Sequence, residues 1–332
     1  MNVPIVYDEI IEACAQAGGT ERSEIDAVAG ALARMGYEPL PMPVNLSVDK
    51  SAFQSLGARF IFNCIDSLDE SGRFVHIVPT ILDELCIPYT GASADAIYLT
   101  SNKLLAKRFL RVHELRTARW STVDQAAAGD VPFAPPYIVK HVWEDASFGL
   151  DERSVFHKKA DLVAHAAGVG AGQRDDYFVE AFIDGREFNV SLISGEDGPL
   201  ALPPLEIEFH GFGEGRPRIV DYETKWGSGS TTEARIERRF EFDGAERPLI
   251  DTLSGIAREC WELFRLEGYA RVDFRVDRDG RPWILEINAN PYLGDDSSFL
   301  AAAARAGLAF DDVIRLIVDD ALGRTEAPAA RW

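Results

Sequence analysis

The chain has 332 residues, of which 46% are hydrophobic and 27% charged, an ordinary balance for a folded globular protein. This length suits two or three domains and allows a large buried core. The formal net charge of −20 argues against nucleic acid or an anionic membrane as a general partner. The four cysteines show no Cys-x-x-Cys spacing, which argues against both a zinc site and a disulfide framework.

The first residues lack the basic and apolar regions of a signal peptide. No apolar run reaches the roughly 20 residues that a membrane-spanning helix needs. The sequence therefore predicts a cytoplasmic protein with small-molecule partners.

The N-terminal part alternates between patterns typical of strands and of helices. A helix is predicted over 25–35, where apolar residues recur at helical spacing before Gly36. Strands are predicted over 38–44, 59–65 and 87–91, and a helix over 74–85. Such alternation indicates a parallel sheet covered by helices.

The remaining elements begin with a basic helix over 101–111 and strands over 137–140, 177–182 and 186–194. The clearest local pattern is a hairpin, in which strands over 269–277 and 282–288 flank the turn signal Asp279-Gly280. The Ala-rich segment over 299–322 predicts helix.

Side chains of the predicted hairpin alternate between two faces. On the first strand, one face carries Arg271, Asp273 and Arg275. On the return strand, Trp283, Leu285 and Ile287 are expected on one face, and Ile284, Glu286 and Asn288 on the other.

If the two polar faces coincide, Asp273, Glu286 and Asn288 converge beside Arg271. Three hard oxygen donors of this kind suit Mg²⁺ held against a phosphate. The alternative is a solvated face with ordinary cross-strand ion pairs. The apolar residues around Ile284 favour a buried hairpin, in which carboxylates need a partner.

A series of short motifs runs along most of the chain: Pro88-Tyr-Thr-Gly91, the helix of Lys103, Ile138-Val-Lys140, Val179-Glu-Ala-Phe-Ile-Asp-Gly-Arg-Glu187, Leu202-Pro-Pro-Leu-Glu-Ile207, Tyr222-Glu-Thr-Lys225, Gly268-Tyr-Ala-Arg-Val-Asp273 and Leu285-Glu-Ile-Asn-Ala-Asn-Pro291. Their order and spacing resemble the D-alanine–D-alanine ligases and their ATP-grasp relatives over about residues 59–322. The resemblance implies a mixed α/β ATP-grasp fold preceded by a βα pre-ATP-grasp domain. It predicts domains over 1–91, 92–183 and 184–332, with ATP between the last two.

The resemblance also implies roles for single residues. The phosphates are expected to bind Lys103, Lys140, Lys225 and a closing loop that contains Ser147. The adenine edge is expected to contact Glu180 and Phe182, and the ribose hydroxyls are expected to contact Glu187. Mg²⁺, with Mn²⁺ as a substitute, is expected to bind Asp273, Glu286 and Asn288, and Arg271 is expected to bind the acyl phosphate and its oxyanion. Taken without the family, Lys103 and Lys140 would be interpreted as surface lysines, the Ser147 loop as a plain turn and Glu187 as an exposed carboxylate.

The implied reaction joins a carboxylate to an amine through an acyl phosphate. Catalysis would come from positioning of the reactants and from stabilisation of charge. Three alternatives stay open: D-alanine–D-alanine ligation itself, ring closure onto an internal nucleophile, and nucleotide binding without catalysis. Family members are commonly homodimers, so the resemblance is compatible with a dimer.

The motifs depart from the family pattern where substrates are expected to bind. The segment 18–24 only faintly matches the family's first substrate loop, and Glu21 and Glu24 are interpreted as acids at a helix N-terminus. The other departures are Asp66 in place of a histidine, Trp226 in place of a tyrosine, and Tyr292, Asp295 and Asp296 in a stretch that holds a substrate carboxylate. We therefore expect a substrate other than D-alanine.

Overall fold

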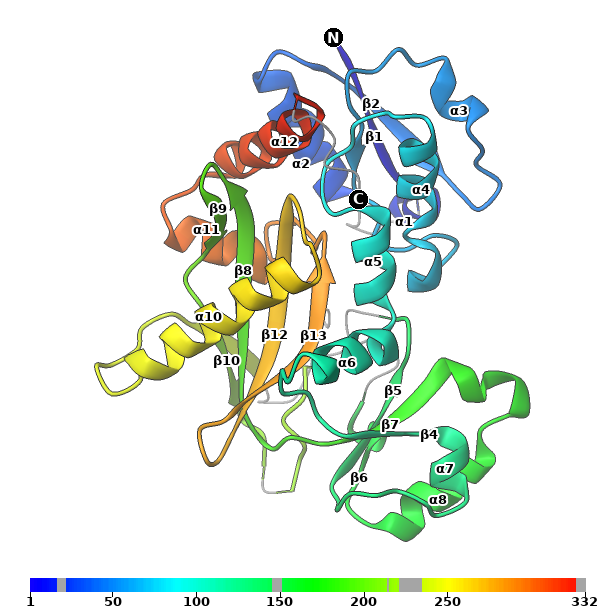
Figure 1. Cartoon of the computed structure of the whole chain (residues 1–332), viewed down its shortest axis with the longest axis vertical. Coiled ribbons are helices and arrows are strands. Elements are labelled where there is room, and N and C mark those ends of the chain that lie inside the picture. The colour runs from blue at the N-terminus through cyan, green and yellow to red at the C-terminus, as the bar shows by residue number, and fades with distance from the viewer. Residues whose placement is uncertain (17–21, 145–150, 214, 221–234, 327–332) are drawn as a thin grey trace.

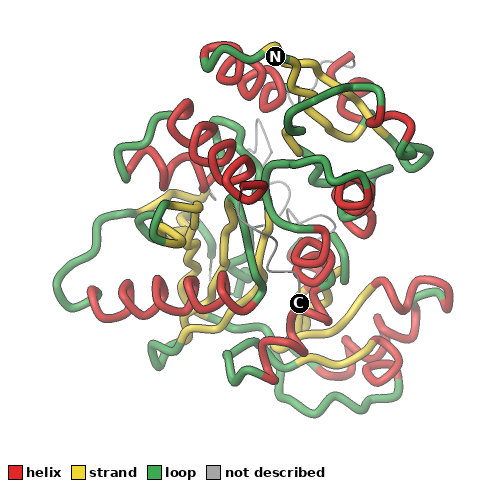
Figure 2. Tube along the Cα trace, turned by 45° about the horizontal axis from the view of Figure 1, so that its top comes forward, coloured by secondary structure: helices red, strands yellow, loops and turns green. Residues whose placement is uncertain are grey.

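The computed structural model describes residues 1–16, 22–144, 151–213, 215–220 and 235–326, and its strands form three sheets (Figure 1). Figure 2 shows the strands in three separate groups with helices packed around them. Within the described ranges, no helix is both long and apolar enough to cross a membrane. Ser147, Lys225, Trp226 and Glu21 lie outside the described residues.

The N-terminal sheet is parallel, with strand order β2-β1-β3. Its elements are β1 (Asn2–Asp8), α1 (Ile10–Gln16), α2 (Ser23–Arg34), β2 (Glu38–Val44), α3 (Ser51–Gln54), β3 (Phe62–Asn63), a 3₁₀ turn (Gly72–Phe74) and α4 (Ile77–Glu84). The parallel sheet and the helix over 25–35 are thereby confirmed. The strands predicted over 59–65 and 87–91 are wrong in extent, because beyond β3 they make only an isolated bridge between Ile61 and Tyr89.

The central sheet is antiparallel, in the order β4-β7-β5-β6, and α7 and α8 pack beside it. Two helices lead into it from the N-terminal part, and its elements in chain order are α5 (Ala94–Ser101), α6 (Lys103–Val112), β4 (Trp120–Thr122), α7 (Val123–Ala127), β5 (Tyr137–His141), a 3₁₀ turn (Glu152–Ser154), β6 (Val155–Phe156), α8 (Lys159–Gly168), a 3₁₀ turn (Ala171–Asp176) and β7 (Tyr177–Ala181). The strands predicted over 137–140 and 177–182 correspond to β5 and β7.

The C-terminal sheet is antiparallel, in the order β11-β10-β8-β12-β13, with β9 paired to β8. Its elements are β8 (Gly185–Gly195), β9 (Gly198–Ala201), β10 (Leu205–His210), β11 (Arg235–Arg239), α10 (Arg247–Leu263), β12 (Tyr269–Asp277), β13 (Pro282–Ala289), α11 (Ser298–Arg305) and α12 (Phe310–Glu326). The hairpin predicted over 269–288 is therefore confirmed as β12 and β13.

Two buried clusters join these parts of the chain. One extends from Val6 and Ile61 in the N-terminal part to Leu253 of α10 and Val272 of β12. In the other, α12 packs beside α2, where Arg34 pairs with Asp311 at 2.6 Å (Figure 1). The N-terminal and C-terminal sheets therefore share their cores.

A β-bulge in the hairpin overturns part of the predicted side-chain alternation. Asp273 lies opposite Glu286, but Phe274 lies opposite Ile284, so Leu285 has no partner in the pairing register. Ile284 consequently enters the core, whereas Leu285 lines the same pocket as Glu286. The prediction that Ile284 shares the face of Glu286 and Asn288 is wrong, because the extra residue shifts the alternation by one position.

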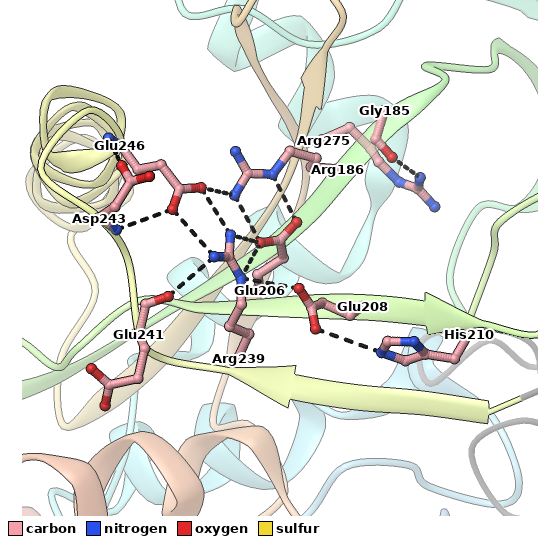
Figure 3. A network of polar contacts seen from close by, with 10 residues as sticks. All are labelled: Gly185, Arg186, Glu206, Glu208, His210, Arg239, Glu241, Asp243, Glu246 and Arg275. Carbon is pink, nitrogen blue, oxygen red and sulfur yellow. Dashed lines mark hydrogen bonds and ion pairs between the residues drawn. The ribbon is translucent and has the colours of Figure 1, made fainter.

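The face of the C-terminal sheet that meets α10 carries a network of ion pairs (Figure 3). Arg186 of β8 binds Glu206 of β10 at 2.7 Å, and Arg239 of β11 binds Glu246 at 2.8 Å. The hydrogen bond from Arg239 lowers the pKa of Glu246 to about 2. The network joins three strands to the start of α10, while Glu187, the next residue after Arg186, points to the opposite face.

Candidate active site

An open pocket lies between the central and C-terminal sheets, and its volume, part of which is open to solvent, is about 760 Å³. Its wall contains residues from α6, β5, β7, β8, β12 and β13: Lys103, Ile138, Lys140, His141, Glu144, Glu180, Ala181, Phe182, Ile183, Glu187, Ile219, Val220, Arg275, Leu285 and Glu286. Segments that are distant in the sequence thus bring together most of the residues predicted to bind the nucleotide.

Two lysines enter the pocket from different elements. Lys103 is the first residue of α6, whose N-cap Asn102 accepts a hydrogen bond from the Leu105 N–H at 2.9 Å. Its side chain is 7% exposed, and its Nζ lies 3.4 Å from Oε2 of Glu286. Lys140 lies near the end of β5, with its Nζ 2.7 Å from Oε2 of Glu180. The two ammonium groups suit binding to a polyphosphate, and that role stays a prediction.

Glu180 of β7 lies between two lysines and is almost fully buried. Its carboxylate pairs with Lys140 and also with Lys107, to which the sequence reasoning assigned no role. Burial opposes ionisation of Glu180, but the two ammonium groups outweigh it and lower the pKa of this carboxyl group. The predicted contact of Glu180 with adenine stays a prediction, and the carboxylate itself is engaged by lysines.

Glu187 shares the pocket with Arg275, a second residue without a predicted role. Nη2 of Arg275 lies 2.7 Å from Oε2 of Glu187. The guanidinium lies 5.7 Å from the ring centre of Phe182 and 5.5 Å from that of Phe209. Burial raises the pKa of Glu187, and the nearby Arg275 opposes that shift. The predicted ribose contact of Glu187 stays a prediction.

Three predicted site residues of the hairpin, Arg271, Asp273 and Asn288, are not among the residues of the pocket wall but lie together beside Glu286, which is. Arg271 binds Asp273 through two hydrogen bonds of 2.7 and 2.8 Å. Asp273 also accepts hydrogen bonds from Asn189 at 2.6 Å and from Asn288 at 3.0 Å. Asn189 was missed, although its place on β8 opposite Asp273 follows from strand pairing.

The donor set at the hairpin fits a hard divalent cation. Asp273 and Glu286 are cross-strand neighbours of like charge, which Arg271 and Lys103 compensate in this structure and which a metal between them would also compensate. Burial opposes ionisation of Glu286, but neighbouring cations, Lys103 foremost, outweigh it and lower the pKa of this carboxyl group. The described part of the chain gathers no three His, Cys, Asp or Glu side chains at one point. A metal there needs Oδ1 of Asn288 and phosphate oxygens to complete its shell.

Comparison with known proteins decides the family. The profile described as "D-ala D-ala ligase C-terminus" matches residues 110–319. The chain belongs to this ligase family. The uncharacterized protein y4sG of Sinorhizobium fredii is 31% identical over 263 residues, which cover 78% of this chain and 73% of that protein.

A D-alanine–D-alanine ligase of Stutzerimonas stutzeri is 36% identical over 242 residues, which cover 71% of this chain and 70% of that enzyme. The structure of the Bacillus anthracis D-alanine–D-alanine ligase complexed with ATP superposes with a TM-score of 0.70 at 19% identity, over 98% of this chain and 100% of that chain. The ATP-grasp fold and the mixed α/β class are confirmed. The protein is an ATP-grasp ligase of the kind that forms carbon–nitrogen bonds.

Glu24, in the segment that faintly matches the family's first substrate loop, lies in a different environment from the one expected for an acid at a helix N-terminus. This residue lies in the first turn of α2, but its side chain is buried and accepts a hydrogen bond from the Leu293 N–H at 2.7 Å. The placement of Glu24 at a helix N-terminus is therefore confirmed, whereas its burial and its contact with Leu293 were not predicted. Asp295 and Asp296 are exposed, as is Asp66, and Tyr292 is half-buried.

Glu24 makes the stability of the ligase depend on pH. Burial, assisted by the charge of Asp66, raises the pKa of Glu24 to about 8. The unfolded chain releases this proton near pH 4.3, so from about pH 5 to about pH 8 only the folded state retains it. We expect the free energy of unfolding to fall as pH rises through this window, by on the order of 2–4 kcal/mol.

Urea denaturation of the wild type and of Glu24→Gln at pH 5.5, 7 and 8.5 measures this contribution as the difference between the two proteins. The wild type should lose stability relative to Glu24→Gln as pH rises. A difference that stays constant across the three pH values contradicts the assignment.

Proposed function

We propose that this ligase activates the carboxylate of an amino acid or amino-acid-like acid with ATP and joins it to an amine. The observation that carries the proposal is the placement of Arg271, Asp273 and Glu286 on one hairpin, with Lys103 beside Glu286 and Lys140 in the same pocket. An arginine beside the predicted metal ligands favours catalysis over nucleotide binding alone, because it can stabilise an oxyanion.

The proposed reaction has two steps. A carboxylate oxygen attacks the γ-phosphorus of ATP, which forms an acyl phosphate and releases ADP. The amine then attacks the acyl carbon, a carbon–nitrogen bond forms, inorganic phosphate leaves and the amine loses a proton. Lys103 and Lys140 hold the phosphates, and Arg271 stabilises negative charge on the acyl phosphate and the tetrahedral oxyanion. Bound Mg²⁺ supplies neutralisation of phosphate charge, and Asp273, Glu286 and Asn288 are the residues that would hold it.

We propose further that D-alanine is not the acid. In support, the stretch 288–296 carries Tyr292, and Asp66 stands where the family pattern has a histidine. Tyr292 is half-buried near the carboxylates of Asp296 and Asp66 and the protonated carboxyl group of Glu24, an acidic setting for a substrate group. Asp295 and Asp296, two acids in a stretch that binds a substrate carboxylate in the family, are exposed to solvent, so their charges do not support this proposal. We also propose a cytoplasmic enzyme, because the reaction would depend on ATP, and a homodimer by analogy with the family.

The test is Mg²⁺-dependent release of ADP and phosphate with a panel of single and paired D- and L-amino acids. Release that depends on one acid, and that disappears in Asp273→Asn/Glu286→Gln, is the expected result. Strong release with D-alanine alone would make the protein a D-alanine–D-alanine ligase instead. A mass spectrum of the product distinguishes ligation from ring closure.

A further inference from the structure

Lys107 is a buried cation that the proposed reaction does not use. It lies one helical turn after Lys103 in α6, and its side chain is 2% exposed. Lys103 and Lys140 line the pocket, whereas Lys107 is not among the described residues of its wall. An ammonium group in such a position requires a partner of opposite charge.

That partner is Glu180, which Lys107 shares with Lys140. Lys107 pairs with Oε1 of the carboxylate, and Lys140 pairs with Oε2 at 2.7 Å. The three groups carry two positive charges and one negative charge, so one positive charge is left over. Lys140 is the member of the pair that faces the pocket, and the remaining charge therefore acts there.

Lys107 is also fixed from its other side. Its Nζ donates a hydrogen bond to Oγ1 of Thr117 at 2.6 Å, and this hydroxyl donates to the Ile284 carbonyl at 2.9 Å. Ile284 adjoins the bulge of β13, two residues before Glu286. Lys107 therefore connects the central sheet, through Glu180, to the strand that carries the predicted metal ligand.

We infer that Lys107 is a positioning residue that occupies one oxygen of Glu180 and so leaves Lys140 with a net positive charge for the phosphates of the nucleotide. This inference rests on the proposed function, because it assumes that Lys140 binds phosphate. Without Lys107, Glu180 would neutralise Lys140 fully and hold it away from the nucleotide. Burial lowers the pKa of Lys107, against the effect of Glu180, which agrees with a costly cation kept in place by its carboxylate.

The test compares the dissociation constants of ADP and of adenosine, measured by calorimetry with Mg²⁺, in the wild type and in variants. Lys107→Met should weaken ADP binding about tenfold or more and leave adenosine binding nearly unchanged. Lys107→Arg should retain most of the ADP affinity. Lys50→Met is the matched control, since Lys50 pairs with Glu84 at an exposed site, and it should change neither constant.

The double variant Lys107→Met/Glu180→Gln separates positioning from a purely structural role. It removes both buried charges and frees Lys140. Because Glu180 is also a predicted adenine contact, the readout is the ratio of the ADP to the adenosine dissociation constant, which should return close to its wild-type value. The inference is overturned if Lys107→Met binds ADP as tightly as the wild type, or if this ratio in the double variant stays at its Lys107→Met value.

Should Lys107→Met fail to fold, Glu180→Gln alone decides. It leaves Lys140 unpaired, so the ratio of the ADP to the adenosine dissociation constant, which cancels any change in the predicted adenine contact of Glu180, should not exceed the wild-type ratio. A higher ratio overturns the inference. A wild type that binds no ADP would refute the proposed function and would be distinguished from these outcomes by that measurement alone.

Discussion

Arg271→Met is expected to lower kcat about 10²- to 10³-fold and to leave the dissociation constant of ADP close to that of the wild type. Arg271 is held by two hydrogen bonds to Asp273, so its guanidinium is fixed in advance of the reaction. A preorganised cation of this kind acts on charge that develops during the reaction, and its loss therefore appears in kcat. Steady-state kinetics with the acid identified in the panel, together with calorimetric ADP binding, measure both quantities.

Arg278→Met is the matched control for this experiment. Arg278 lies in the turn of the same hairpin, is exposed and pairs with Asp184. Its loss should leave kcat unchanged. If Arg271→Met also retained the wild-type kcat, the assignment of Arg271 to the oxyanion would be wrong. A parallel loss of ADP affinity would instead indicate that the variant disturbs Asp273.

The hairpin shows what could be predicted from the sequence and what could not. Alternation along β12 places Arg271 and Asp273 on one face, because successive side chains in a strand point to opposite sides. The bulge at Leu285 could not be predicted, since its position depends on how two strands pair and not on either strand alone. The side-chain face of Ile284 was therefore assigned wrongly, while Glu286 was placed correctly beside Asp273.

The roles of Lys107 and Glu24 could not be predicted from the sequence for a different physical reason. Lys107 follows Lys103 at i+4, so the sequence contains the signal that both lie on one helix face. Its partner Glu180 comes from β7, and no local pattern indicates that contact. Glu24 likewise binds Leu293, near the opposite end of the chain. Burial of a charged group depends on such long-range packing. The position of Glu24 at the start of a helix therefore could not show that its side chain is buried.

The predicted metal site can be tested without turnover. Asp273→Asn should weaken the binding of Mn²⁺ in the presence of ADP about tenfold or more, as measured by electron paramagnetic resonance of the free metal ion. The substitution keeps the shape of the side chain and one accepting oxygen, but it removes the negative charge and replaces the other oxygen with an NH₂ donor. Asp279→Asn, in the turn of the hairpin where Asp279 pairs with exposed Arg281, is the matched control and should bind Mn²⁺ as the wild type does.

Glu286→Gln should weaken Mn²⁺ binding by a similar factor, and its effect should not depend on pH between 6 and 8. Lys103 and other cations lower the pKa of Glu286, so the carboxylate is already ionised throughout this range. A group with a depressed pKa loses its charge only as pH falls through that low value. If Mn²⁺ affinity in Asp273→Asn and Glu286→Gln equalled that of the wild type, the hairpin would not hold the metal. The face shared by Asp273 and Glu286 would then be a set of structural ion pairs with Arg271 and Lys103.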